Sequence, residues 1–509
     1  MSGTVTPYRS ARQAGRDGFA RLLRAEWTKF RTVPGWMLGL AVAVLATVLV
    51  SLLGVLGGHA SCGGGPGGGT CTGPVGPGGE AVTDSFTFVN RPLTGDGGIT
   101  VRLASLTGAR SGVEPWAKAG IIVKDGDSQG SAYAAVMATG AHGVRMQDDF
   151  THDTAGPPGA VSADSPRWLR LTRSGDTLTG FASADGTHWS TVGTAHLKGL
   201  PTTVRAGLFV TSPDHLDVTD RIGGAAATGG PTRATGVFDQ VGLSGNWPQA
   251  AWSGTSVGDR GPMTASLGGF TQSGDSFTVN GSGDIAPAVD SGGGQTLERR
   301  LIGTFAGLIV VIVVATLFIT AEYRRGLIRT TLTASPRRVR VLAAKAVVIG
   351  SVTFAAGLVA AVAAVVIGGQ VLRSEGVYVY PVSTLTELRV VVGTAGLLAV
   401  TAVLALALGT VLRRSAGAVT AVVVAIVLPY ILAMASVLPT GPADWLLRVT
   451  PAAAFAVQQS LPQYAQVSNP YTPPNGYFPL APWAGFGVLC GYAVLALALA
   501  AHLLRRRDV

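Results

Sequence analysis

The chain has 509 residues, a formal net charge of +10 and only 13% charged residues, whereas 47% are hydrophobic and the mean hydropathy is +0.39. An ordinary soluble protein has about a quarter charged residues, so this class is disfavoured. Three cysteines exclude a disulfide-rich scaffold and a multi-cysteine zinc module. Because charges are missing from several stretches of about 20 residues, the basic excess indicates membrane-spanning helices and not a nucleic-acid partner.

The first expected element is an amphipathic helix at residues 19–33, which belongs to a basic N-terminal segment of residues 1–35. Its cationic residues Arg21, Arg24, Lys29 and Arg31 lie mainly opposite an apolar face. This pattern predicts an interfacial helix on the membrane surface. The apolar face consists of Phe19, Leu22, Leu23, Trp27, Phe30 and Val33.

Six apolar runs are long enough to cross a bilayer. A cleaved signal peptide does not fit the first run, because the basic region before it is about 35 residues long. The predicted spans are 36–57, 301–321, 341–371, 390–412, 416–438 and 482–504, with an outer loop at 439–481.

The distribution of charge predicts the orientation in the cell membrane. Residues 1–35, 322–345, 413–415 and 505–509 hold 19 of the 38 Lys and Arg residues but only 4 of the 28 acidic residues. Because basic segments stay inside, both termini are expected in the cytoplasm. Arg299 and Arg300, at the outer mouth of the second span, are a local exception.

About 240 residues separate the first two spans and are expected outside the cell. Residues 58–83 form a Gly-rich linker containing Cys62 and Cys71, for which an oxidising compartment predicts a disulfide. Cys490, in the last span, has no expected partner.

Residues 84–290 change to a period-two pattern with turn residues such as 95–98 between the runs. Many short strands with regular turns predict an all-β sandwich. The expected strands are 85–90, 99–106, 119–124, 132–137, 168–173, 178–183, 204–211 and 237–243.

The strings "EPWAKAGIIVKDGDSQGSAYAAV", "PRWLRLTRSGDTLTGFASADGTHWSTVG" and "VRAGLFVTSP" resemble concanavalin/laminin-G-like modules of secreted bacterial glycan-active proteins. The resemblance implies a jelly-roll of two sheets that binds carbohydrate in some relatives. The usual opening of such modules appears here at the far end, in residues 267–287. We therefore expect a circular permutation, with 277–279 a strand of the same sandwich as 86–88.

Two sets of residues in this domain have a ligand-binding interpretation beside a structural one. Large aromatic side chains could stack on sugars, but packing in the sandwich core is favoured for Trp116, Trp168 and Trp189. Oxygen-rich loops could bind calcium, but turn formation is favoured for Asp125, Asp127, Asp214, Asp217 and Asp220.

The sequence contains no complete enzyme signature among the motifs considered. The G-x-S-x-G string at 254–258 is followed by Asp-Arg-Gly-Pro instead of a helix, so it is not a nucleophile elbow. No phosphate-binding loop, H-E-x-x-H motif or paired-cysteine metal spacing occurs. We expect no catalytic residue, metal or cofactor in this chain.

The basic segment "TAEYRRGLIRTTLTASPRRVRVLAAK" at 320–345 carries an apolar stripe of Tyr323, Leu327, Ile328 and Leu332 before Pro336. Together with "LLRAEWTKFRTVPGWML" and "LLRRRDV", it resembles permease subunits of type-two ATP-binding-cassette (ABC) exporters, over residues 16–57 and 300–509. The resemblance implies an elbow helix before the first span, a coupling helix at 322–340 and two short helices within 444–461. The residues implied to couple to the ATPase are Glu322, Tyr323, Arg324, Gly326, Ile328, Arg329, Pro336, Arg337 and Arg338.

The resemblance implies a homodimer that works with a separate ATPase subunit, which would bind the ATP and Mg²⁺. In support, the interiors of the spans show no Asp, Glu, Lys or Arg of the kind that ion-coupled transporters use. The alternatives are a membrane-anchored glycan-binding protein, which would need only one span, and an envelope-stress sensor with the permease fold. The substrate stays open among drugs, lipids, peptides and glycans.

Overall fold

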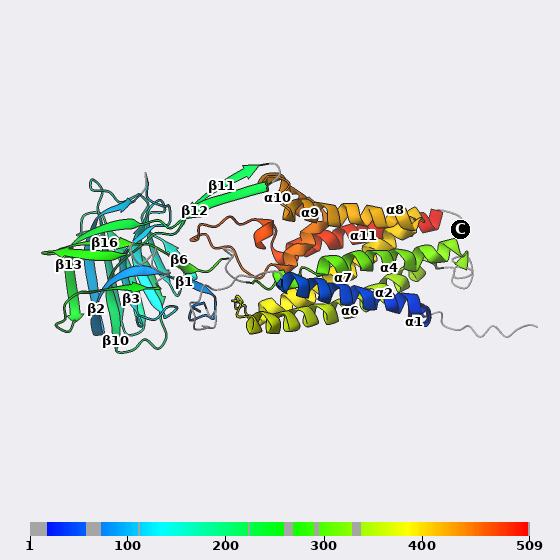
Figure 1. Ribbon diagram of the computed structural model, residues 1–509, viewed down its shortest axis with the longest axis horizontal. Helices are drawn as coiled ribbons and strands as arrows, with labels where there is room; N and C mark the ends of the chain where they lie inside the picture. Colours follow the sequence, from blue (N-terminus) through cyan, green and yellow to red (C-terminus); the bar gives the residue numbers. More distant parts are fainter. Residues whose placement is uncertain are drawn as a thin grey trace, which may run out of the picture.

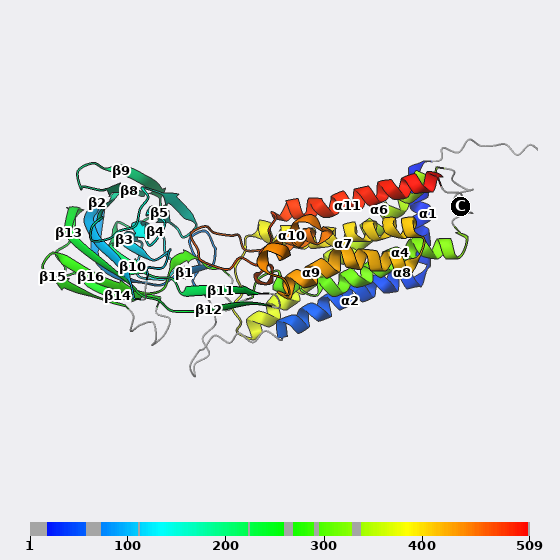
Figure 2. The ribbon, with the colours of Figure 1, turned by 90° about the horizontal axis from the view of Figure 1, so that it is seen from above.

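The computed structural model describes residues 18–56, 73–109, 112–221, 224–258, 268–289, 295–327 and 337–506. A β domain lies at one end of the elongated molecule and a helical bundle at the other (Figures 1 and 2). We call the end of the bundle next to the β domain the domain end. The opposite end, which carries the N-terminal helix and the end of the last helix, is the base.

Six helices in the described residues are long and apolar enough to cross a membrane, as predicted. The fifth span is interrupted by a π-helical turn, η2, which ends two residues before Pro429, a residue with no N–H to continue the helical ladder. The helices of the bundle are α1 (Phe19–Thr32), α2 (Pro34–Leu56), η1 (Arg299–Leu301), α4 (Thr304–Arg324), α6 (Arg338–Ser374), α7 (Thr384–Leu412), α8 (Ser415–Val422), η2 (Val423–Val427), α9 (Leu428–Met434), α10 (Thr440–Val449), η3 (Pro451–Gln458), η4 (Pro473–Asn475) and α11 (Pro482–Arg506).

Two short helices occupy the region where they were expected between the last two spans. They are α10 and η3, and Figure 2 shows α10 at the domain end. All eight residues of η3 are buried, and Gly485 of α11 lies so close that an added Cβ would come within 2.2 Å of the Ala453 carbonyl oxygen. This segment is therefore packed into the bundle.

The strands form two layers joined by β2 (Phe86–Gly108). Its first half pairs with β10 and β14, and its second half pairs with β7 and β13. One layer has the order β14-β2-β10-β3-β4-β5-β6 and the other β15-β16-β13-β2-β7-β8-β9. The remaining strands are β3 (Lys118–Lys124), β4 (Tyr133–Thr139), β5 (Val144–Asp148), β6 (His152–Ala155), β7 (Arg167–Ser174), β8 (Thr177–Ser183), β9 (Ser190–His196), β10 (Thr203–Thr211), β13 (Ala234–Asn246), β14 (Ser253–Val257), β15 (Gly269–Ser273) and β16 (Ser276–Gly281).

The turn predicted at residues 95–98 is wrong. These residues lie inside β2, which passes from one layer to the other at this point. Gly95 has a φ of +73°, and a Cβ at Gly97 would lie 2.5 Å from the Ser244 carbonyl oxygen. The glycines therefore allow a bend and a close strand contact, and the chain does not reverse.

The two ends of the β domain meet in a short antiparallel pair, β1 (Val82–Asp84) and β17 (Ile285–Pro287). We call this pair the neck. As predicted, 277–279 is a strand, since β16 pairs with β13 in the sheet that contains β2. Both chain connections to the membrane helices therefore leave from the same edge of the domain.

Two buried ion pairs join the neck to β3. Lys124 Nζ lies 2.8 Å from Asp84 Oδ2 at the end of β1, and Lys118 Nζ lies 2.6 Å from Asp284 Oδ1 just before β17. Neither lysine side chain is exposed. Since an unpaired buried charge is costly, each pair holds one end of the neck against the sheet.

The neck is also packed against the bundle. Ala81 is buried in a cluster with Tyr380, Leu461 and Tyr477 from the loops at the domain end. Gln466 Nε2 lies 3.4 Å from the carbonyl oxygens of Phe150 and Thr151 in the β domain. The domain thus rests on the loops before α7 and α11.

We expect Lys124→Met to loosen the neck, because it leaves the Asp84 carboxylate buried without its counter-ion, at a cost of about 3–5 kcal/mol. Hydrogen–deuterium exchange of the full chain should show faster exchange in β1, β3 and β17. The exposed Lys198 provides the control, and Lys198→Met should leave exchange unchanged. Equal exchange in the two variants would show that the ion pair does not hold the neck.

Candidate functional site at the base of the bundle

Four charged side chains from three helices meet at the base. Lys345, near the start of α6, donates to Glu26 Oε2 of α1 at 2.7 Å and to Glu322 Oε1 of α4 at 2.6 Å. Lys29 of α1 lies 3.0 Å from Glu26 Oε1 and 3.5 Å from Glu322 Oε1. We call these residues the base cluster. Two ammonium groups thus balance two carboxylates.

The base cluster is largely shielded from solvent. The side chains of Lys345, Glu26 and Glu322 are 1%, 3% and 11% exposed, whereas that of Lys29 is 42% exposed. Lys345 Nζ also lies 4.9 Å from the ring centre of Phe318, a distance that permits a cation–π contact. Removing Lys345 would therefore leave two buried carboxylates with only the partly exposed Lys29 as a counter-ion.

Aromatic rings extend the same junction. The Phe318 ring of α4 meets Phe30 of α1 edge-on at 5.7 Å and Trp36 of α2 at 5.9 Å. Phe30 is fully buried. Helix α1 is therefore fixed to the spans by apolar packing as well as by charge.

Lys29 is on α1, outside the spans. Its partial burial lowers the pKa of the amine, but the carboxylates of Glu26 and Glu322 outweigh this effect and raise the pKa above its ordinary value. Lys29 is therefore positively charged at neutral pH, and the base cluster keeps its charge balance.

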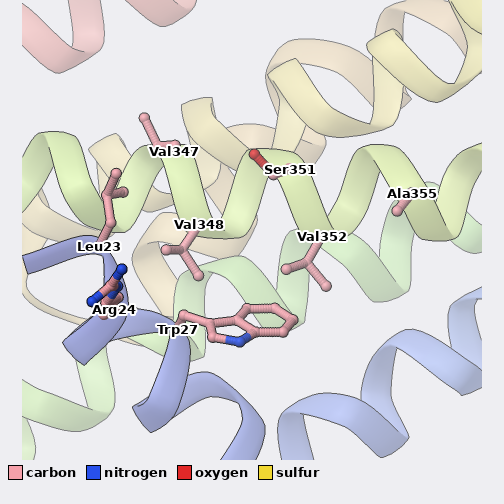
Figure 3. Close-up of a pocket in the computed structure, with 8 residues that line it drawn as sticks. All are labelled: Leu23, Arg24, Trp27, Val347, Val348, Ser351, Val352 and Ala355. Carbon is pink, nitrogen blue, oxygen red and sulfur yellow. The ribbon is translucent and has the colours of Figure 1, made fainter. Parts of the chain in front are cut away.

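The amphipathic helix was predicted correctly as α1, separate from the first span. Its predicted apolar face is unevenly buried: Phe19 and Trp27 are 38% and 43% exposed, whereas Leu22 and Leu23 are half-buried. Leu23 and Trp27 line an apolar groove of about 430 Å³ with Val348 and Val352 of α6 (Figure 3). The groove therefore lies between α1 and α6.

The described residues predicted to contact an ATPase lie on both sides of residues 328–336, at the end of α4 and at the start of α6. Tyr323 faces the Arg413 guanidinium at 5.3 Å, and Arg338 donates to the Leu504 carbonyl oxygen of α11 at 2.6 Å. Arg324 and Arg337 are exposed, whereas Glu322 belongs to the buried cluster. Ile328, Arg329 and Pro336 lie outside the described residues.

The backbone conformation at Gly326 favours glycine. Its φ is +66°, and no atom lies within 4 Å of an added Cβ. The left-handed conformation ends the helix, and any other residue would be strained there.

Sequence reasoning missed Glu26 and Lys345. Glu26 lies three residues after Leu23 and four after Leu22, inside the apolar stripe, so an acid at that position was a signal of burial. Lys345 was counted with the cytoplasmic segment 322–345, but it is buried near the start of α6. The two carboxylates explain how the bundle tolerates it.

Residues with a proposed ligand role in the β domain do not gather at one place. Trp116 is 5% exposed and stacks on His142 with ring centres 4.0 Å apart, whereas Trp168 and Trp189 are half-buried beside Gly186. The Arg170 guanidinium lies 3.9 Å from the Trp189 ring centre. Core packing is thus observed fully for Trp116 and partly for the other two.

The acidic residues considered for calcium occupy turns and a hairpin. Asp125 and Asp127 are exposed in the loop after β3, and Asp214 and Asp217 lie at the start of the hairpin β11 (His215–Arg221) and β12 (Gly224–Gly230). The Asp220 side chain lies outside the described set. Within that set, no three His, Cys, Asp or Glu residues gather as a metal site.

Two further sequence features have structural outcomes. Ser256 of the G-x-S-x-G string lies in strand β14, opposite Thr87, and not at a strand-to-helix turn. Cys62 and Cys71 lie outside the described residues, so their disulfide stays a prediction. Cys490 of α11 is a free thiol.

Replacing Lys345 tests the base cluster. We expect Lys345→Met to destabilise the bundle by about 3–5 kcal/mol, because the carboxylates of Glu26 and Glu322 stay buried. Adding Glu26→Gln and Glu322→Gln to Lys345→Met should restore most of the loss. Thermal unfolding of the detergent-solubilised chain measures both effects, and an unchanged midpoint for Lys345→Met alone would contradict the ion-pair assignment.

Two solved structures to which parts of the chain are similar match at low TM-scores. A scytalido-glutamic peptidase with a transition-state analogue inhibitor is 10% identical, with coverage of 39% of this chain and 98% of that chain and a TM-score of 0.26. A functionally unknown protein from Saccharomyces cerevisiae is 18% identical, with coverage of 34% and 76% and a TM-score of 0.20. These TM-scores support no argument about fold or activity. No curated protein matches the chain.

A family model matches most of the chain. The model of the ABC-2 family transporter proteins matches residues 123–509, about three quarters of the chain. The matched region includes most of the β domain and every helix from α4 to α11. Together with the six apolar helices, this match shows that the chain belongs to the ABC-2 transporter family.

Proposed function

We propose that this chain exports its substrate as a homodimer in which each copy binds a separate ATPase subunit at the base. Membership of the ABC-2 family makes the chain a permease subunit that works in a membrane with a partner ATPase. Export, the homodimer and the docking position are our additions. In this proposal the base is cytoplasmic, because the predicted inside segments carry half of the basic residues.

The observation that carries the proposal is the base cluster. It joins α1, the end of α4 and the start of α6, which flank the segment predicted to dock on the ATPase. A push on that segment would therefore be passed to α1 and to two spans together. Buried, directionally hydrogen-bonded charges resist sliding between helices, so they suit the transmission of force.

We further propose that the β domain is a jelly-roll that lies outside the cell and binds an envelope glycan or the exported substrate. Its neck rests on the domain end of the bundle, which supports a position over the exit of the transport path. The half-buried Trp168 and Trp189 would provide the sugar-stacking surface. Trp116 is excluded from this role by its burial.

Reversing two exposed charges at the end of α4 tests the proposed docking position of the ATPase. We expect Arg324→Glu combined with Arg325→Glu to reduce co-purification of the ATPase subunit and the ATP hydrolysis of the complex by at least about tenfold, since each exposed arginine would face an acidic partner. The measurement is ATPase activity of the complex purified from native membranes.

The matched control is Arg505→Glu with Arg506→Glu, which reverses the same charge at the same end of the bundle on α11. The control should retain the ATPase. Equal losses in both double variants would indicate a general charge effect and contradict docking at the segment between α4 and α6. A chain that binds no ATPase at all would favour the sensor alternative.

A further inference from the structure

A polar pocket lies at the domain end, between η1, the end of α6 and the start of α7. Its volume is about 440 Å³, and it is lined by side chains of both signs together with apolar residues of α6. The residues that matter for its chemistry are Arg300, Gly369, Arg373, Tyr380 and Glu387. Arg300 belongs to the pair that breaks the charge pattern expected for an outer segment.

Arg300 is buried without a direct ion pair in the described residues. The residue is 5% exposed, its buried Nε has no hydrogen-bond partner there, and the carboxylates of Glu387 and Glu298 attract it only from a distance. A Cβ added at Gly369 would lie 3.1 Å from Arg300 Nη1, so the glycine leaves room for the guanidinium. A buried cation without a partner is costly, which points to a ligand that supplies the negative charge.

The other charged groups of the pocket leave a net positive charge. Arg373 lies at the exposed rim, and Glu387 at the start of α7 is the one acidic residue among the lining side chains. The carboxylate of Glu298 also attracts Arg300, but it accepts a hydrogen bond from Ser460 and does not line the pocket. Among the lining side chains, two guanidinium groups against one carboxylate favour an anion. The planar fork of arginine matches the oxygen atoms of a phosphate group in particular.

Apolar surface continues from the pocket along α6. Val365 and Val366 line the pocket, and Val362, Val366 and Ile367 are 45%, 49% and 40% exposed. Leu385 and Leu388, beside Glu387 on α7, are 78% and 59% exposed. A charged pocket above exposed apolar side chains on a membrane-spanning helix matches a molecule with a phosphate head and acyl chains.

We propose that this pocket holds the phosphate of an anionic phospholipid from the membrane leaflet nearest the β domain. Arg300 and Arg373 bind the phosphate oxygens, and the acyl chains lie along Val362 and Val366 of α6. This assignment does not depend on the direction of transport or on the docking of an ATPase.

The bound lipid would also support the neck. Tyr380 lines the pocket, donates from its hydroxyl to the Val289 carbonyl oxygen at 3.3 Å, and donates its N–H to the Gln295 carbonyl oxygen at 3.2 Å. These contacts join the segment after β17 to the loop before α7. Occupation of the pocket therefore stabilises the connection between the domain and the bundle.

The test measures lipid binding to the purified full-length chain in detergent, by native mass spectrometry and by the shift in thermal unfolding. The three probes are phosphatidylglycerol, phosphatidylcholine with the same acyl chains, and soluble glycerol phosphate. We expect phosphatidylglycerol to bind most tightly and glycerol phosphate to have little effect. Equal binding of glycerol phosphate would indicate a free-phosphate site, and equal binding of both lipids would overturn the charge-based assignment.

Three single substitutions test whether phosphatidylglycerol binds in this pocket. Arg373→Gln should weaken phosphatidylglycerol binding about tenfold, the loss expected for one charge-assisted hydrogen bond. Glu387→Gln should strengthen binding, because it removes the opposing carboxylate. Arg448→Gln, an exposed arginine of α10 at the same end of the bundle, is the control and should have no effect. If Arg373→Gln behaves like this control, or Glu387→Gln weakens binding, the proposal is wrong.

Discussion

The arrangement of the base depends on one buried ammonium group held between two carboxylates. Lys345 brings together Glu26, 319 residues away in the chain, and Glu322, 23 residues away. The burial of such groups is tolerated only with close partners, since each loses its hydration. Helices α1, α4 and α6 are therefore confined to positions in which all three side chains meet. The rings of Phe30 and Phe318 close the apolar side of the same junction.

The β domain obeys a related constraint at the other end of the bundle. Helices α2 and α4 pack closely, as a Cβ on Gly303 would lie 1.9 Å from the Thr47 carbonyl oxygen. A domain inserted between two adjacent helices must begin and end at neighbouring positions. The pairing of β1 with β17 meets this requirement, and the buried pairs Asp84–Lys124 and Asp284–Lys118 fix it to the sheet. Lysine–carboxylate pairs thus occur at both ends of the bundle.

The sequence predicted those features that arise from local periodicity. The six spans, the separate α1 and most strands follow from hydropathy and period-two patterns, and the strand at 277–279 follows from the resemblance to a permuted module. The turn at 95–98 failed because glycines in a strand that bends resemble those in a strand that reverses. Glu26 and Lys345 were missed because their pairing is tertiary: each looks like an ordinary charge near a membrane surface until the partner is seen.

We propose that the base cluster makes α1 and α6 one mechanical unit during the transport cycle. It can be tested by joining cysteines introduced at Leu23 and Val348, which line the same groove, with a short bifunctional thiol reagent in a chain whose three native cysteines are replaced (Figure 3). ATP-dependent transport by the complex is then measured before and after cross-linking. We expect the cross-linked protein to keep its activity, because the two helices move together. Arrest of transport by the cross-link, with recovery after its cleavage, would contradict the proposal.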